Sequence, residues 1–202
     1  MLRLETRWVV SLSTLLVLCV RRDADTALFV LGAVLNAVLS KVLKRCFNAA
    51  RPAGAKLSDP GMPSSHAQSL FFFGGFLARA ARHGPALAVA FSHASELALA
   101  RYRAFLPLAA LAVAAVLSLD RVRQGLHTLP QVAVGGLIGG IGGTLWHAHQ
   151  PALSVALGGA AHPAAVGGLV ACGALVVASV ERTLAAERKR RGAPAGDSGH
   201  RE

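Results

Sequence analysis

The stretch Gly61–Leu77, GMPSSHAQSLFFFGGFL, determines the architecture of this chain. Its polar part ends in Ser64, Ser65 and His66, and a mostly apolar run follows. A serine before an apolar run is typical of a helix N-cap, which predicts a helix starting near His66. The free N–H groups and positive dipole end of such a helix suit a phosphate. The alternative is an ordinary serine cap with an incidental histidine.

Apolar runs alternate with short polar segments along the rest of the chain. Of the 202 residues, 53% are hydrophobic and only 15% are charged, a balance that is rare in soluble proteins of this length. Since about 20 apolar residues span a bilayer, we predict an all-α, polytopic transmembrane bundle of five or six helices. The candidate spans are 8–20, 27–43, 66–82, 104–119, 129–147 and 163–180.

Two segments leave alternatives open. The run 8–20 is short enough to be a secretory signal, but the charged residues at 21–23 follow it at once and favour a retained helix. The stretch Ala86–Arg103 carries His93, Glu96 and two arginines, and we expect it to be a connecting or interfacial segment rather than a span.

Two further segments, the glycine-rich run at 135–143 and the C-terminal residues 181–202, have distinct compositions. The glycines between 135 and 143 have small-xxx-small spacings, which predict close packing within one bundle, with a dimer face as the alternative. Residues 181–202 are basic and poor in apolar side chains, so we expect a disordered tail. Residues 1–180 would form one integral membrane domain.

The formal net charge of +11 indicates an anionic partner. In a membrane chain, lipid headgroups or phosphate esters fit this charge better than nucleic acid does. The cysteines, Cys19, Cys46 and Cys172, have no spacing typical of pairing or metal binding, so neither a disulfide nor a zinc site is expected.

A first basic motif, KRCFNAARP, covers Lys44–Pro52. Lys44 and Arg51 flank it, and Pro52 disfavours further helix, so that the chain turns out of the membrane there. Two cations at the headgroup level are suited to hold phosphate oxygens. Basic residues at a helix end are also common as snorkelling anchors or topology signals.

A further motif, RVRQGLHTLPQ, covers Arg121–Gln131. Gln131 follows His127 by four residues, so a helix places both on one face. There the amide oxygen of Gln131 can accept the imidazole N–H, leaving the other ring nitrogen free to attack. A lone histidine at an interface is often structural. Because each helical hairpin returns the chain, the three motifs should meet at one membrane face.

The three motifs resemble those of the type 2 phosphatidic acid phosphatase family, which is related in fold to vanadium haloperoxidases and bacterial acid phosphatases. The family motifs run KxxxxxxRP, PSGH and SRxxxxxHxxxD. The matching positions are Lys44, Arg51, Pro52, Pro63, Ser64, His66, Arg121 and His127. Three positions depart from the pattern: Ser65 replaces Gly, Asp120 replaces Ser, and Gln131 replaces Asp. An acid beside Arg121 would neutralise a phosphate ligand, pair with Arg123 or hold Arg121 in place.

The departures indicate a branch of that family. The strings GMPSSHAQ and HTLPQV, and Leu35-Asn36 before the first motif, look like dolichyl diphosphatases and the similar plastid lipid phosphate phosphatases. The similarity spans about residues 27–147.

The resemblance implies a role for each matching residue. His127 would attack phosphorus to form a phosphohistidine, His66 would protonate the leaving oxygen and later activate water, and Gln131 would orient His127. No metal or other cofactor would be required, and the sequence offers no carboxylate cage for one. The phosphate would be held by cations, a hydroxyl and backbone N–H groups from Lys44, Arg51, Arg121, Ser64, Ser65 and His66.

The implied activity is hydrolysis of a polyprenyl (dolichyl) diphosphate to the monophosphate and inorganic phosphate. The alternative within the family is a phosphatidate or lipid phosphate monoester phosphatase. From a different class, a non-catalytic membrane scaffold or a transporter subunit would also use helix-end cations. The branch favours the endoplasmic reticulum first and a plastid membrane second, with the lipid bilayer and the lipid substrate as partners.

Overall fold

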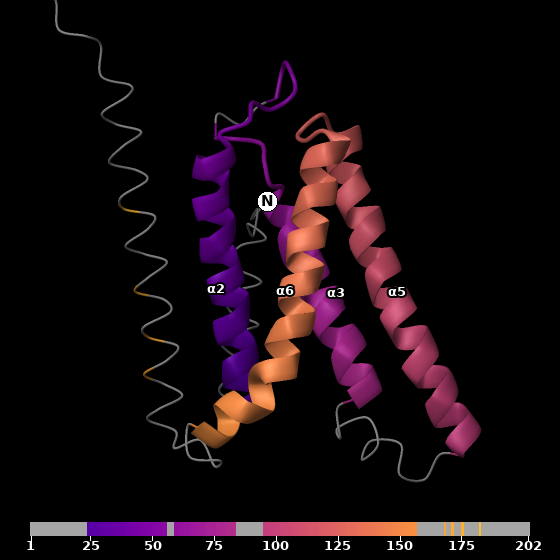
Figure 1. The fold of residues 1–202 in the computed structure, drawn as a ribbon. Helices are drawn as coiled ribbons and strands as arrows, with labels where there is room; N and C mark the ends of the chain where they lie inside the picture. The colour runs from indigo at the N-terminus through magenta and orange to yellow at the C-terminus, as the bar shows by residue number, and fades with distance from the viewer. Residues whose placement is uncertain are drawn as a thin grey trace, which may run out of the picture.

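The computed structural model describes residues 24–55, 59–83 and 95–156, with four isolated helical positions beyond them at 168, 171, 175 and 182. The described part is all-helical, with α2 (Ala24–Phe47), α3 (Ser65–His83), α5 (Glu96–Arg123) and α6 (Leu129–Ala156), as Figure 1 shows. The predicted helices at 8–20 and 163–180 and the tail 181–202 lie, apart from the isolated positions, outside the described residues. The number of membrane spans therefore stays a prediction.

The helix α5 begins earlier than the sequence indicates. The side chain of Ser95 accepts a hydrogen bond from the N–H of Ala98 and caps the helix. Glu96 lies in the first turn, where its negative charge interacts favourably with the positive end of the helix dipole. Residues 96–103, predicted to be part of a connecting or interfacial segment, therefore belong to the helix α5, and residues 86–94 of that segment lie outside the described residues. Arginine is a good helix former, so the charges of Arg101 and Arg103 do not interrupt α5.

The chain reverses direction at two turns that lie at the same end of the bundle. Asn48, with φ 41°, follows the end of α2, and Gly125, with φ 66°, follows the end of α5. A residue in the left-handed region is a common helix stop. Because α3 and α6 start beyond these turns, all three motifs gather at one end of the bundle, as predicted (Figure 1).

The helices α3 and α6 form the tightest contact, through glycines of α6. Gly135, Gly139 and Gly143 are buried, and a Cβ on Gly139 would overlap the carbonyl oxygen of Gln68. At Gly143 a Cβ would overlap the carbonyl oxygen of Phe72. Such overlap means that only glycine permits this approach of the two backbones. The predicted packing of the glycine run within one bundle is confirmed.

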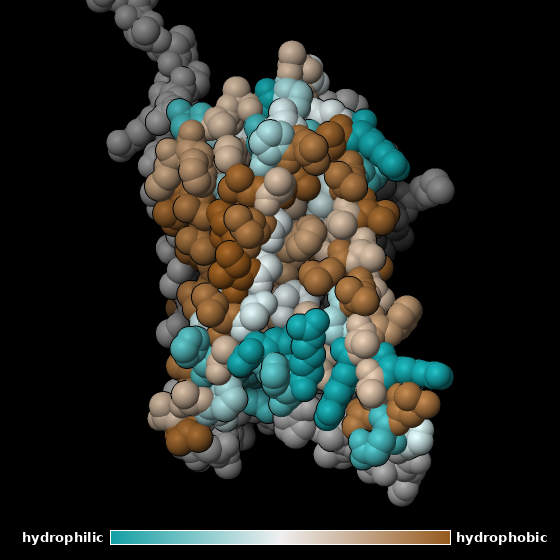
Figure 2. All heavy atoms as spheres, turned by 45° about the vertical axis from the view of Figure 1, so that its right-hand side comes forward, coloured by the Kyte–Doolittle hydropathy of each residue, from teal (hydrophilic) through white to brown (hydrophobic). Residues whose placement is uncertain are grey.

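The outer surface is apolar along the middle of the helices. Large side chains such as Phe105, Val116 and Leu137 are 69%, 65% and 64% exposed. Figure 2 shows apolar residues over the middle of one face and hydrophilic ones toward its ends. Among the described residues, two helices are long and apolar enough to cross a membrane, α2 over Asp25–Phe47 and α5. The fold is consistent with a helical membrane protein.

Candidate functional site

The imidazole of His127 lies in the turn between α5 and α6 and is only 5% exposed. Its Nδ1 lies 2.9 Å from the carbonyl oxygen of Gly61 and 3.3 Å from Oε1 of Gln131. Both partners are acceptors, so the proton sits on Nδ1 and the lone pair on Nε2. The hydrogen bond predicted between His127 and Gln131 is present, and Gly61 supplies a second, shorter one. Gly61 lies in the quoted stretch, but nothing in the sequence indicates this contact.

Gln131 connects all three motifs through its side-chain amide and its backbone carbonyl. Its Nε2 donates to the carbonyl of Ala50 in the first motif at 2.7 Å, and its Oε1 accepts from the N–H of Thr128 at 3.1 Å. Its backbone carbonyl accepts from the N–H of Ser64 in the second motif at 3.0 Å. An aspartate lacks the donor that the Ala50 carbonyl requires, so the glutamine fits this loop where a carboxylate would not.

The guanidinium of Arg51 lies against the lone-pair side of His127. Its Nη1 is 3.0 Å from His127 Nε2 and donates to the Leu126 carbonyl at 2.7 Å. Arginine only donates, so this contact also identifies Nε2 as the acceptor nitrogen. The other edge faces Asp59, with Nε on the backbone carbonyl at 2.9 Å and Nη2 at 3.1 Å from both carboxylate oxygens.

Asp59 is the site residue that the sequence does not reveal. Its carboxylate also accepts from Nζ of Lys44 at 2.5 Å, so it lies between the two cations of the first motif. Burial alone would raise the pKa of Asp59, but hydrogen bonds and charge from Lys44 and Arg51 outweigh it and lower that pKa. The one available signal was that no other acid occurs between Lys44 and His66.

The start of α3 agrees with the predicted N-cap. Ser64 is fully buried, and its Oγ accepts from the N–H of Ala67 at 3.4 Å. The hydroxyl of Ser65 accepts from that of Ser40 on α2 at 2.8 Å. His66 is exposed in the first turn. Of these three predicted site residues, His66 presents its side chain most openly.

Arg121 and Asp120 lie at the end of α5, close enough to His66 for both charges to act on it. Asp120 accepts a hydrogen bond from the amide of Gln124, whose oxygen accepts from Nη1 of Arg121 at 3.3 Å. Of the three predicted roles for Asp120, the geometry favours holding Arg121, through Gln124. In the part of the chain that the structure describes, the buried Nε of Arg121 has no hydrogen-bond partner.

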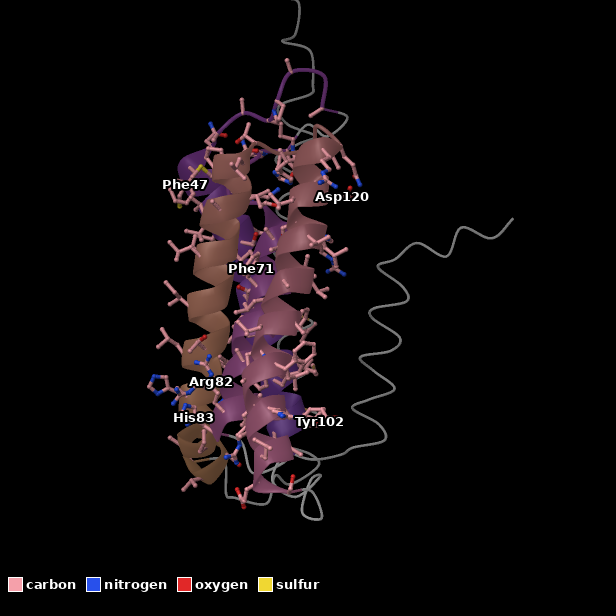
Figure 3. The ribbon with its side chains drawn as sticks, turned by 90° about the vertical axis from the view of Figure 1, so that its right-hand side faces the viewer. Phe47, Phe71, Arg82, His83, Tyr102 and Asp120 are labelled. Atoms are coloured by element: carbon pink, nitrogen blue, oxygen red, sulfur yellow. The ribbon has the colours of Figure 1, made fainter. Side chains whose placement is uncertain are left out.

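Figure 3 shows that the site occupies one extreme of the bundle. Phe47 and Asp120 mark this end, Arg82, His83 and Tyr102 mark the opposite end, and Phe71 lies between them. The described site thus lies at one end of the helices rather than along their middle.

The electrostatics keep His127 in its neutral form. Burial of the imidazole and the positive charge of Arg51 lower the pKa of His127, against the hydrogen bonds to Gln131 and Gly61, which raise it. The net shift is downward from the ordinary value of 6.5. At neutral pH the ring therefore carries an unprotonated Nε2 beside a buried cation, which is the state required of a nitrogen nucleophile.

Comparison with known proteins finds relatives that match between 62% and 70% of this chain. The chain is 38% identical over 142 residues to lipid phosphate phosphatase epsilon 2, chloroplastic, from Arabidopsis thaliana, covering 70% of this chain and 46% of that protein. It is 34% identical over 132 residues to dolichyldiphosphatase 1 from Homo sapiens, covering 62% and 53% respectively. The chain spans about half the length of the curated relatives it matches.

No family model and no solved structure matches the chain. The names of these relatives nevertheless agree with the family that the three motifs resemble. The structure brings residues of all three motifs together around His127. The chain belongs to the type 2 phosphatidic acid phosphatase family of lipid phosphate phosphatases.

Proposed function

We propose that the chain is a membrane phosphatase that removes phosphate from a lipid through a phosphohistidine at His127. The observation that carries this proposal is the orientation of the imidazole. Gly61 and Gln131 hold its Nδ1–H, while its Nε2 lone pair faces the cation of Arg51. A nucleophile beside fixed positive charge is the arrangement that phosphoryl transfer needs.

The reaction then has two steps. Phosphate oxygens replace Nε2 as the acceptor for Arg51, Nε2 attacks phosphorus, and the bond to the leaving oxygen breaks with its electron pair on that oxygen. Protonated His66 gives the leaving oxygen its proton. Neutral His66 next takes a proton from water, whose oxygen attacks phosphorus, and the N–P electron pair returns to His127. Arg121 is a further cation for a phosphate oxygen, and its buried Nε has no hydrogen-bond partner among the described residues.

The substrate that we propose first is a polyprenyl diphosphate, hydrolysed to the monophosphate and inorganic phosphate. The groups on Nδ1 are a carbonyl and an amide, which stabilise an imidazolium less than a carboxylate would. A phosphate ester is a better leaving group than a lipid alkoxide, so such a nucleophile suffices. A relative named dolichyldiphosphatase agrees with this choice.

A lipid phosphate monoester such as phosphatidate is the second candidate. It is favoured by the relatives of 38% and 36% identity, both named chloroplastic lipid phosphate phosphatases. The same names favour a plastid membrane over the endoplasmic reticulum under this candidate.

Phosphate release by the purified protein in detergent tests the function and separates the candidates. With EDTA present, we expect release from a polyprenyl diphosphate at least about tenfold faster, in kcat/KM, than release from phosphatidate, because the leaving groups differ. The reverse order would establish the monoester activity. Absence of release from either substrate would contradict the proposal and leave the scaffold or transporter reading.

An apolar groove between α3, α5 and α6 supports a lipid substrate. Its volume is about 710 Å³, and its lining runs along α6 from Leu129, two residues after His127, to Thr144. At about 1.5 Å per residue these positions are about 22 Å apart, most of the roughly 30 Å hydrocarbon core. We propose that this groove holds the hydrocarbon chain while the phosphate reaches His127.

Gly140→Phe tests the groove. Gly140 lines it, and a Cβ at this position meets nothing within 4 Å, so the new ring fills the groove without disturbing the α3–α6 contact. We expect kcat/KM for a long-chain substrate to fall about tenfold or more, because about one buried side chain's volume of lipid contact is lost. Hydrolysis of a short, water-soluble phosphate ester should change little.

The matched control for the groove is Leu145→Phe, an exposed residue of α6 outside the groove lining. It adds a ring of the same kind to the outer surface. Equal losses for both variants, or equal losses for long and short substrates, would refute the groove as the chain-binding site while leaving the phosphatase proposal intact.

A further inference from the structure

The carboxylate of Asp59 occupies the place where the first motif should receive phosphate. It contacts Lys44 through one oxygen and Arg51 through both. The side chains of Lys44 and Arg51 are only 11% and 6% exposed, whereas that of Asp59 is 24% exposed. The carboxylate is thus the most exposed member of this cluster, and its two partner cations are nearly buried.

The hydrogen bonds of Arg51 are fully used in this arrangement. A guanidinium has five N–H groups, and the structure gives Arg51 contacts to the Asp59 carbonyl, both Asp59 carboxylate oxygens, the Leu126 carbonyl and His127 Nε2. The carbonyl contacts belong to the backbone and fix the arginine in place. A phosphate oxygen therefore gains Nη2 only by displacing the carboxylate of Asp59.

A carboxylate and a phosphate present similar acceptors to a guanidinium. Both form charge-assisted, bidentate pairs with arginine, and both take the third contact from a lysine as a point charge. Asp59 is ionised at neutral pH, since the two cations lower its pKa. Its negative charge also opposes that of an incoming phosphate directly.

We infer that Asp59 is an internal anion that competes with phosphate for Lys44 and Arg51 and so weakens the binding of inorganic phosphate to the site. This inference rests on the proposed function, because it assumes that the two cations serve a phosphate. The carboxylate keeps the buried cations paired while the site is empty and returns when inorganic phosphate leaves. Asp59 accordingly limits product inhibition rather than carrying out a chemical step.

Binding of inorganic phosphate to Asp59→Asn, measured by isothermal titration calorimetry in detergent, tests the inference. The amide keeps the size of the side chain and removes its charge, so we expect the dissociation constant for phosphate to fall about tenfold relative to the wild type. The inhibition constant of phosphate against hydrolysis should fall by the same factor. If Asp59 only positioned the cations, Asp59→Asn would instead raise the dissociation constant for phosphate and raise KM.

Glu96→Gln is the matched control, since it removes an acid from the first turn of α5, at the end of that helix away from the site. Glu96 is exposed, so loss of its charge should change phosphate affinity by no more than about twofold. An equal fall of the dissociation constant for phosphate in both variants would mean that net charge alone causes the effect, and it would overturn a specific role for Asp59.

The calorimetric readout separates this inference from the proposed function. Tighter phosphate binding by Asp59→Asn in a protein that hydrolyses no lipid would support competition at the site and contradict the phosphatase. Hydrolysis by the wild type without tighter binding in the variant would overturn the competition alone. Asp59→Ser is the second variant, and failure of both variants to give a folded, monodisperse protein would show that Asp59 is structural.

Discussion

His127→Ala should lower kcat for phosphate release by about 10⁴-fold or more. The substitution removes the ring nitrogen Nε2, whose lone pair faces Arg51, and loss of a covalent nucleophile has effects of this size. Rapid quenching after mixing with labelled substrate should trap an acid-labile phosphoenzyme in the wild type and none in the variant.

Two measurements show that such a loss is chemical. Thermal unfolding of His127→Ala in detergent should remain cooperative, and inorganic phosphate should still bind, because Lys44, Arg51 and Arg121 are retained.

The acid limb of kcat/KM in the wild type should lie below pH 6.5, since burial and Arg51 lower the pKa of His127 and its neutral form persists into mild acid. A phosphoenzyme in the variant would contradict the assignment.

Gly139→Ala, like Gly143→Ala, should strongly destabilise the contact between α3 and α6. The new Cβ overlaps the carbonyl oxygen of Gln68, so the backbones of α3 and α6 must separate, at a cost of about 3 kcal/mol. Because α3 carries His66 and α6 carries Gln131, activity should fall with stability. The midpoint of thermal unfolding in detergent measures the change.

Gly140→Ala is the neighbouring control. Its Cβ meets open space, so the change in helix propensity dominates and should stabilise α6 by up to about 1 kcal/mol. We therefore expect the free energy of unfolding to fall for Gly139→Ala and to rise for Gly140→Ala. Similar destabilisation at both would mean that the packing of α6 differs from the arrangement described.

The sequence predicts the parts of this molecule that depend on local pattern. The serine cap of α3, the apolar helices and the four-residue spacing of His127 and Gln131 follow from neighbours along the chain, and the structure contains all three. The convergence of the motifs follows from counting reversals between helices.

The features that escaped prediction depend on contacts between distant segments. The carbonyl of Gly61 reaches His127 across 66 positions, and the amide of Gln131 reaches Ala50 across 81. Asp59 has no spacing that would mark it before the loop closes on Arg51. The early start of α5 was missed because charged residues were read as a break, although they occupy the end of a continuous helix.

The bond from Gln131 to Ala50 restricts how this chain can evolve. A single exchange of Gln131 for the aspartate usual elsewhere in the family would set two acceptors against each other, so the loop around Ala50 would have to change first or at the same time. The acceptor is a backbone carbonyl, which any residue at position 50 presents, so the compensating change has to alter the conformation of the loop rather than the side chain at position 50. An evolutionary change toward a more strongly activated His127 therefore requires a change in the loop of the first motif before, or together with, the change at position 131 in the third motif.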